Sequence, residues 1–274
     1  SSNTIHTYKY LQLVETYFDE VLLITNEKST VYDFPTVELS FNLKIKNIFS
    51  TVKAIKKHIN QFQPTIIHIH QANSYAFYGL LASRKVKIPT VLTAWGSDVL
   101  VIPKSNFLLK KIVQFNLRTA DYLTSDSNFM AAEMKKLAPS IKEILISNFG
   151  IDVTPLACEK ENIIYSNRLH KKLYRVDKII EAFALFNANS ETNDWRLVIA
   201  ASGTGTEKLK NKAKSLGLAN NVDFVGWIQK EENEQWYSKA KIWVSIPESD
   251  ATSISLLEAM ACGCIPVVSD LPAN

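Results

Sequence analysis

The chain has 274 residues, of which 46% are hydrophobic and 21% charged, and these values exclude a largely disordered protein. The length allows two domains of ordinary size. Three cysteines at irregular spacing, Cys158, Cys262 and Cys264, argue against a disulfide framework and against a zinc site of the CxxC type. We therefore expect a reducing compartment.

The net charge of +4 is concentrated in the first half, where residues 1–154 carry 17 Lys and Arg against 12 Asp and Glu, a local charge of +5. A basic surface suits an anionic partner such as a membrane, and an ordinary solvated surface explains it equally well. No run approaches the roughly 18 apolar residues of a membrane span, and the first ten residues lack a signal peptide's apolar stretch. We expect a cytoplasmic protein, with peripheral contact at the inner face of the membrane as an option, and no nucleic-acid partner.

Short apolar runs alternate with amphipathic segments along the chain. The runs are rich in Val and Ile and about five residues long, which is typical of strands buried in a parallel sheet. The alternation predicts right-handed βαβ units and a doubly wound α/β fold. The predicted strands are 21–25, 65–70, 90–94, 122–125, 144–147, 163–166, 196–201, 222–226, 242–246 and 265–269, and the predicted helices include 46–61, 178–187, 206–216 and 230–239.

The series of strands and helices occurs twice, which predicts two Rossmann-like domains. Residues 148–160 contain a glycine, a proline and a charged run, a composition that suits a connection between domains. We place the domains at residues 1–153 and 154–274. Because the chain opens in a predicted helix and closes directly after a predicted strand, we expect a first strand and the last helices to lie outside this sequence.

The stretch from Pro247 to Gly263 carries the strongest chemical signal. It predicts a strand, a polar loop and a helix that opens near Thr252 or Ser253, whose free backbone N–H groups and dipole suit a diphosphate. Glu258 lies about one and a half turns into that helix and would accept hydrogen bonds from vicinal hydroxyls. A capped helix with a solvated glutamate explains the same residues without a ligand.

Residues 250–266 resemble the nucleotide-sugar motif of retaining GT-B glycosyltransferases of the group-1 or family-4 type. In that motif an acidic residue is followed, after seven others, by Glu-Ala-Met-Ala-x-Gly-x-Pro-Val, and Asp250 and Glu258 have this spacing. The resemblance implies that Glu258 holds the ribose hydroxyls and that Asp250 contacts the transferred sugar. The family's first acid is usually Glu, so Asp250 is a departure and Glu248 is a second candidate. The donor-binding residues expected at the start of the helix are Ser253, Ile254 and Ser255.

A second cluster, residues 166–178, places basic side chains after a predicted strand, at the edge where such folds bind ligands. An arginine grips a phosphate with two N–H groups, whereas a lysine acts as a point charge. In the family an Arg here and a Lys several residues on both bind the diphosphate. Arg168 matches the first, and either Lys172 or Arg175 matches the second. A solvated basic loop is the alternative without a ligand.

Two further loops follow predicted strands in this half. The pair Gly203 and Gly205 is a weak signal alone, and Lys208 stands where a dinucleotide fingerprint needs a third glycine, which disfavours an oxidoreductase. In the family a similar glycine loop lines the nucleotide site, so we expect both glycines there. Trp227 lies in a segment that resembles the family's loop approaching the base.

The first half carries weaker signals. His68 and His70 share one face of a predicted strand, and without a nearby third ligand we expect them to be architectural rather than metal-binding. Many family members have a His where Trp95 stands, and Trp95 offers an aromatic face for a sugar or base. Gly96 would permit close backbone approach, and Asp98 would bind a hydroxyl of donor or acceptor.

Segment 107–115 mixes apolar residues and lysines on a predicted helix. Such a helix suits a membrane surface, and we favour ordinary core packing for its apolar residues.

Together these motifs imply a GT-B fold, with an acceptor-side N-terminal domain and a nucleotide-sugar-binding C-terminal domain facing a cleft. The expected reaction is transfer of a hexosyl group, with retention, from a nucleotide-diphosphate sugar to an acceptor. The acceptor expected by resemblance is a saccharide or lipid-linked saccharide of a cell-surface polysaccharide. Asp250 and Arg168 are the expected catalytic residues. The sequence has no Asp-x-Asp metal motif, so we expect no metal and no cofactor beyond the donor co-substrate.

Two alternatives stay open. The chain would be a catalytically weakened GT-B-fold protein that only binds nucleotide sugars, an option that rests on Asp250 and Trp95. Alternatively it would be a GT-B enzyme with another outcome, such as sugar epimerisation, although the Glu-Ala-Met-Ala segment favours the transferases.

Overall fold

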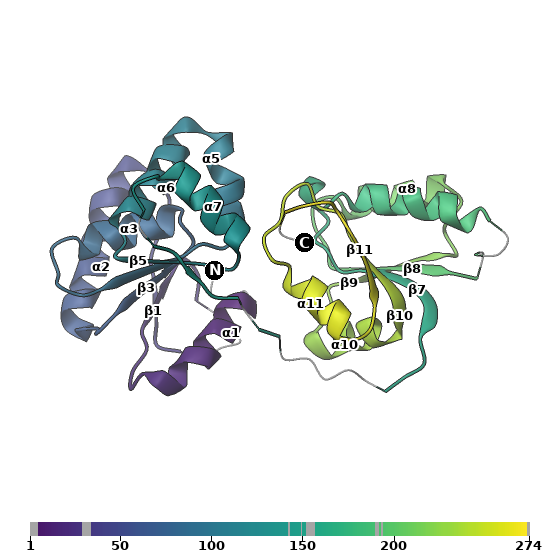
Figure 1. Ribbon diagram of the computed structural model, residues 1–274, viewed down its shortest axis with the longest axis horizontal. Coiled ribbons are helices and arrows are strands. Elements are labelled where there is room, and N and C mark those ends of the chain that lie inside the picture. Colours follow the sequence, from purple (N-terminus) through teal and green to yellow (C-terminus); the bar gives the residue numbers. More distant parts are fainter. Residues whose placement is uncertain are drawn as a thin grey trace. The chain divides into compact units, whose positions relative to one another are not determined.

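Figure 1 shows a computed structural model of the chain. The chain separates into two compact units, Ser1–Ser147 and Asn148–Asn274, and each is described by itself. The boundary predicted after residue 153 lies outside the described residues. The structure describes residues 5–28, 34–141, 143–148, 150–151, 157–189, 192 and 194–272.

The first unit contains a four-stranded sheet in the order β3-β4-β5-β6 and a separate pair β1-β2, and every pairing is parallel. The strands are β1 Leu23–Thr25, β2 Thr36–Glu38, β3 Ile67–His70, β4 Thr90–Thr93, β5 Tyr122–Ser125 and β6 Leu145–Ile146. The helices are α1 Ile5–Val14, α2 Ile45–Phe62, α3 Ser74–Ser83, α4 Ser97–Leu100, α5 Ile102–Ser105, α6 Phe107–Thr119 and α7 Asn128–Leu137, with a 3₁₀ turn η1 at Glu15–Tyr17.

The helices of this unit are held to the sheet by apolar stripes and by one buried amide. Ile55 and Ile59, one turn apart on α2, are both buried, as helical spacing predicts. Asn116 on α6 is fully buried, and its Nδ2 donates to the carbonyls of Ala72 at 3.0 Å and Asn73 at 2.8 Å. This bond pair fixes α6 to the loop that follows β3.

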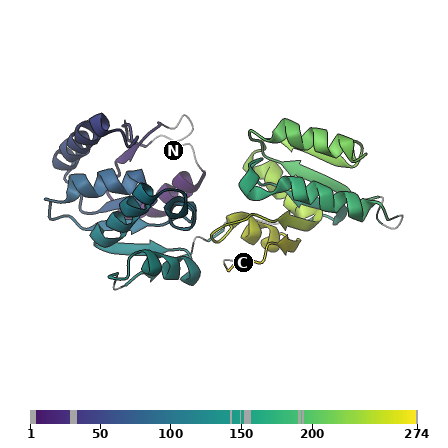
Figure 2. The same cartoon turned by 90° about the horizontal axis from the view of Figure 1, so that it is seen from above.

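The second unit is one five-stranded parallel sheet in the order β11-β10-β7-β8-β9. Figure 2 shows helices on both faces of this sheet. The strands are β7 Glu161–Ser166, β8 Arg196–Ala200, β9 Val222–Gly226, β10 Ala240–Ser245 and β11 Ile265–Val268. The helices are α8 Val176–Asn187, α9 Thr206–Ser215, α10 Lys230–Lys239 and α11 Ile254–Ala261, with a 3₁₀ turn η2 at Lys172–Tyr174.

The core of the second unit follows the period of its strands. Leu197 and Ile199 of β8 pack with α8 and α9 in one cluster, while Val198 and Ala200 pack with α10 and α11 in another. Successive strand residues point to opposite faces, so a strand buried on both sides is apolar at every position. This is the doubly wound α/β architecture that the sequence predicts.

The order of the strands also locates a crevice. β7 lies between β8 and β10, and the chain runs from β7 to β8 and β9 on one side, then returns to β10 and β11 on the other. Loops leaving the carboxyl ends of β7 and β10 therefore diverge, and open α/β sheets bind ligands at such a switch point.

Lys160 has a structural role that its place in a charged run did not indicate. Its ammonium donates to the carbonyls of Tyr237 at 2.9 Å, Ala240 at 2.9 Å and Cys262 at 2.7 Å. These carbonyls lie at the C-terminal ends of α10 and α11, where the last turn leaves carbonyls without helical partners. A cation there satisfies them and complements both helix dipoles.

Among the described residues no helix is long and apolar enough to cross a membrane.

Candidate functional site

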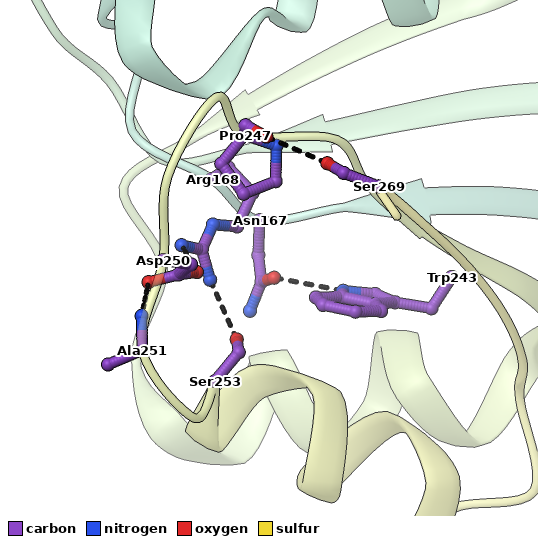
Figure 3. A network of polar contacts seen from close by, with 8 residues as sticks. All are labelled: Asn167, Arg168, Trp243, Pro247, Asp250, Ala251, Ser253 and Ser269. Atoms are coloured by element: carbon purple, nitrogen blue, oxygen red, sulfur yellow. Dashed lines mark hydrogen bonds and ion pairs between the residues drawn. The ribbon is translucent and has the colours of Figure 1, made fainter. Parts of the chain in front are cut away.

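Arg168 stands at the centre of the polar contacts at the switch point (Figure 3). It lies in the loop after β7, and its guanidinium donates to Asp250 Oδ2 at 2.5 Å and to Ser253 Oγ at 2.8 Å. The guanidinium carbon also lies 4.5 Å from the centroid of the Tyr174 ring. Three residues predicted from two separate motifs are thereby brought together, one after β7 and two after β10.

The Arg168–Asp250 pair is mostly shielded from water, with side chains 10% and 23% exposed. Burial raises the pKa of Asp250 above its usual value, and the charge and hydrogen bond of Arg168 oppose that rise. The other carboxylate oxygen accepts from the Ala251 backbone N–H at 3.1 Å. Asp250 is therefore held in one orientation.

Helix α11 begins beside this pair. Its N-cap residue Ser253 has an extended backbone, and its carbonyl accepts from Leu256 at 3.0 Å and Leu257 at 3.3 Å. The Ser253 side chain makes no cap hydrogen bond and accepts from Arg168 instead. The first N–H groups of a helix have no partner inside it, so Ile254 and Ser255 present donors at the positive end of the dipole.

Glu258 lies one turn further along α11 and accepts from the Tyr237 hydroxyl at 3.3 Å. That hydroxyl also accepts from Asn167 Nδ2 at 2.7 Å, and Asn167 Oδ1 accepts from the Trp243 indole at 3.0 Å. Tyr237 and Trp243 are fully buried, and burial raises the pKa of Tyr237. This network joins Glu258 to the residue next to Arg168.

Sequence reasoning missed Asn167 and Tyr237 as positioning residues. Asn167 lies inside a predicted motif, directly before Arg168, and this position could have identified it as a site residue. Nothing in the sequence of α10 distinguishes Tyr237 from an ordinary core aromatic.

The two candidates for a second cation differ in setting. Lys172 is exposed at the start of η2, whereas Arg175 is partly buried and has a left-handed backbone with φ of 51°. Glu248 is exposed, and its backbone N–H donates to the Leu173 carbonyl at 2.9 Å, which ties the loop after β10 to the loop after β7. The choice between Lys172 and Arg175 stays a prediction.

The glycine loop after β8 is shaped by His170. A Cβ added at Gly203 or at Gly205 would lie 2.8 Å from the His170 carbonyl oxygen, a distance that real Cβ atoms do not tolerate. The Gly205 N–H donates to that same oxygen at 3.0 Å, and Nδ1 of the buried His170 ring forms a hydrogen bond with Thr206 Oγ1 at 2.8 Å. Close packing alone therefore requires both glycines, and a contact with a nucleotide stays a prediction.

Trp227 follows the left-handed Gly226 at the carboxyl end of β9. Its side chain is 69% exposed, which leaves its aromatic face accessible to a ligand. Its approach to a base stays a prediction.

In the first unit, Asp98 is 1% exposed and holds its own loop together. Its carboxylate accepts from the backbone N–H groups of Ala72 at 2.6 Å and Trp95 at 3.0 Å. Burial raises the pKa of Asp98, and these hydrogen bonds oppose the rise. Gly96 has φ of 112°, a backbone conformation that favours glycine. The geometry gives Asp98 a structural role, and a hydroxyl contact from it stays a prediction.

The histidine pair lies beside this loop. The Trp95 indole N–H donates to His70 Nδ1 at 3.1 Å, and the two histidine rings stack with centroids 4.4 Å apart. Burial lowers the pKa of His68 to about 4 and that of His70 to about 3, so both rings are neutral. Among the described residues no group of three His, Cys, Asp or Glu side chains is arranged to hold a metal ion.

Two family models match the chain. Residues 151–274 match "Glycosyl transferases group 1", and residues 1–127 match "Glycosyl transferase 4-like". The alpha-monoglucosyldiacylglycerol synthase of Streptococcus pneumoniae is 24% identical over 76% of this chain and 52% of its own length. The chain spans about half the length of the curated relatives it matches.

Solved structures share the architecture. The sucrose-phosphate synthase from Thermosynechococcus elongatus superposes with a TM-score of 0.81 at 15% identity, covering 97% of this chain and 75% of that one. The Anabaena protein HepE in complex with UDP-glucose gives 0.74 at 12% identity, covering 96% and 76%. The fold is therefore GT-B, with two Rossmann-like units. The two family matches place the chain among the group 1 glycosyltransferases, and it belongs to that family.

Proposed function

We propose that the second unit binds a nucleotide-diphosphate sugar and that the protein transfers the sugar to an acceptor with retention. One observation carries the proposal: Arg168, Asp250 and Ser253 meet at the N-terminal end of α11, at the switch point of the sheet. A buried guanidinium beside a helix dipole is suited to a diphosphate.

The site divides into three parts. The diphosphate lies against Arg168 and the N–H groups of Ile254 and Ser255. Glu258 accepts from the ribose hydroxyls, and the hydrogen bond from the Tyr237 hydroxyl orients the Glu258 carboxylate for this role. Asp250 faces the transferred sugar. Trp227, Gly203 and Gly205 are the proposed lining near the nucleoside, and Lys172 or Arg175 supplies the second cation.

The proposed chemistry needs no proton donor from the protein. The bond between the anomeric carbon and the leaving phosphate oxygen breaks, and the acceptor oxygen bonds to the same face of that carbon. The acceptor proton passes to the leaving phosphate. Arg168 and the α11 dipole stabilise the charge that develops on the diphosphate, so we propose that transfer needs no metal and no further cofactor.

The proposed acceptor is a saccharide or lipid-linked saccharide of a cell-surface polysaccharide, bound by the first unit near Trp95 and Gly96. One relative is named for a glucosyldiacylglycerol lipid.

The expected core packing of segment 107–115 is wrong at its start: Phe107 and Leu108 are 75% and 67% exposed, while Val113 is buried. Lys110 and Lys111 lie beside them. We therefore propose a cytoplasmic protein that touches the membrane through the start of α6.

A second candidate is a protein that binds nucleotide sugars without transfer. The observation that favours it is the Arg168–Asp250 ion pair, in which the two proposed catalytic groups engage each other. Binding of a diphosphate sugar without any release of nucleoside diphosphate in the presence of acceptor extracts would select this candidate.

A thermal-shift screen against UDP, GDP, ADP and dTDP tests the proposal. A ligand at 100 times its dissociation constant adds about 2.7 kcal/mol to the free energy of unfolding. The shift with the preferred diphosphate should vanish in Arg168→Ala and Glu258→Ala. The control is Arg196→Ala, because Arg196 is the first residue of β8, at the amino ends of the strands and away from the site, and forms an ion pair with the partly exposed Asp223. Equal shifts in all variants would refute the assignment.

A further inference from the structure

A polar pocket lies in the first unit where β1 and β2 end. It has a volume of about 370 Å³ and is formed by the segments that follow these two strands together with the start of α3. Small-molecule sites typically have volumes of about 300–1,000 Å³, and parallel sheets bind ligands at the carboxyl ends of their strands. The polar residues that line the pocket are Asn26, Glu38, Ser40, Asn42, Ser74 and Tyr75.

Three of these polar residues come from one segment with a period of two. Residues 38–43 read Glu-Leu-Ser-Phe-Asn-Leu, and side chains at alternate positions of an extended chain point to opposite sides. The apolar members of the segment pack against the core cluster formed by α2 and α3. Glu38, Ser40 and Asn42 line the pocket instead, and all three are exposed. The sequence pattern therefore gathers polar side chains on the ligand-accessible side.

The backbone of this segment is anchored to both helices behind it. Thr51 Oγ1 of α2 donates to the Ser40 carbonyl at 2.9 Å, and the Tyr78 hydroxyl of α3 donates to the Asn42 carbonyl at 2.7 Å. Both donors come from helices that pack together in the core. The pocket is thus formed without a ligand, and a preformed site loses less conformational entropy on binding.

The functional groups of the pocket suit a sugar. The Tyr75 hydroxyl donates to Asn26 Oδ1 at 2.5 Å, and the centroids of the Tyr75 and Phe41 rings lie 4.5 Å apart. Glu38 Oε2 accepts from the Lys28 backbone N–H at 3.2 Å, which orients the carboxylate. Carboxylate, amide and hydroxyl groups both accept from and donate to the hydroxyls of a sugar, and an aromatic face suits the apolar side of its ring.

The pocket is negatively charged, although residues 1–154 carry a net charge of +5. Among its described lining residues Glu38 is the one Asp or Glu, and none is Lys, Arg or His. Burial and the nearby charge of Glu27 raise the pKa of Tyr75, so its hydroxyl stays protonated at neutral pH. A phosphate or carboxylate placed here would meet like charge and find no cation, which selects against anionic ligands.

We propose that this pocket binds an uncharged pyranose unit of the acceptor, whose hydroxyls donate to Glu38 and form hydrogen bonds with the side-chain amides of Asn26 and Asn42. The inference rests on the proposed transferase function and specifies its acceptor. The sugar unit held here carries no phosphate and no carboxylate.

Titration of the 274-residue chain with methyl glycosides, followed through its backbone amide resonances, tests the proposal. The neutral probes are the methyl α-glycosides of glucose, galactose and mannose, and the charged probes are methyl glucuronide and glucose 6-phosphate, all at millimolar concentrations. At least one neutral probe should give saturable shifts at the amides of Ser40, Asn42 and Tyr75. Both charged probes should leave these amides unchanged.

Variants assign the contacts. Glu38→Ala should weaken binding of the neutral probe by at least about tenfold, because the charged hydrogen-bond acceptor is lost. Glu38→Gln keeps the size of the side chain and should reduce the discrimination against methyl glucuronide, a change that a merely structural role would not produce. Asn42→Ala should weaken binding by about three- to tenfold. Its matched control is Asn60→Ala, which removes an exposed amide near the C-terminal end of α2 and should bind as the wild type does.

No shift at these amides with any neutral probe, or tighter binding of either charged probe, would overturn the proposal. The nucleoside-diphosphate screen on the same sample separates this failure from that of the proposed function. A diphosphate shift without a sugar at the pocket contradicts the acceptor site alone. A sugar at the pocket without any diphosphate shift supports a saccharide site there and contradicts the donor site.

Discussion

Removing Arg168 should destabilise the second unit by stranding a buried carboxylate. Breaking a buried ion pair by deleting one partner costs about 3–5 kcal/mol. Asp250 remains 23% exposed, and its other oxygen keeps the Ala251 N–H, so we expect a smaller loss, about 2 kcal/mol in Arg168→Ala. Urea unfolding measures the loss through the transition midpoint.

The size of this loss should depend on pH. Burial raises the pKa of Asp250 in the folded protein, and without Arg168 that pKa rises further. The folded state then holds its proton more tightly than the unfolded state, so the penalty is present above the folded pKa and is lost as pH falls through it. Arg168→Ala should therefore be closer to wild type at pH 4 than at pH 7.

A second variant separates charge from packing. Arg168→Ala combined with Asp250→Asn removes the stranded charge and should recover about half of the loss at pH 7. An equal loss at both pH values, or no recovery in the double variant, would refute the account of the pair.

Three further predictions concern other parts of the molecule. Lys160→Met should lower the free energy of unfolding by about 2–3 kcal/mol, because three carbonyls lose a charged donor, while exposed Lys172→Met leaves it unchanged in the same urea titration. Gly203→Ala should lower the free energy of unfolding by about 1–3 kcal/mol, because the added Cβ clashes with the His170 carbonyl. The control is Ser202→Ala at the exposed neighbouring residue, and equal melting temperatures for the two variants would contradict a role for that contact. His68 and His70 have lowered pKa values in the folded protein, so below about pH 6.5 the unfolded state binds more protons than the folded state. The free energy of unfolding should therefore fall as the pH drops from about 6.5 towards 4. Replacing both residues, His68→Gln and His70→Gln, should flatten this pH dependence, and an unchanged pH dependence would place its origin elsewhere.

The sequence predicted the fold because strands buried on both faces must be apolar at every position. The runs 163–166 and 196–201 therefore stood out, and they became β7 and β8. The three-residue β2 was not predicted, because Thr36–Glu38 is too short and too polar to stand out. The separation of β1 from β3 was also invisible, since pairing between distant segments leaves no local pattern.

The candidate site was predicted in its members more than in its contacts. Sequence motifs predict Arg168, Asp250 and Ser253 as site residues, yet the ion pair between Arg168 and Asp250 joins two loops that are 82 residues apart in the chain. Gly203 and Gly205 were predicted to line a ligand site, whereas only the structure shows that close packing against the His170 carbonyl requires glycine at both positions. The sequence does not predict the structural role of Lys160, because a lysine in a charged run is normally solvated.

The measurement that tests the central claim most directly follows the backbone amide resonances of Ile254 and Ser255 during titration with the preferred nucleoside diphosphate. The account predicts saturable shifts at both amides together with the Arg168 side-chain N–H groups, and their loss in Arg168→Ala with the fold intact. Shifts confined to other regions, with α11 unaffected at saturation, would contradict a donor site at this helix.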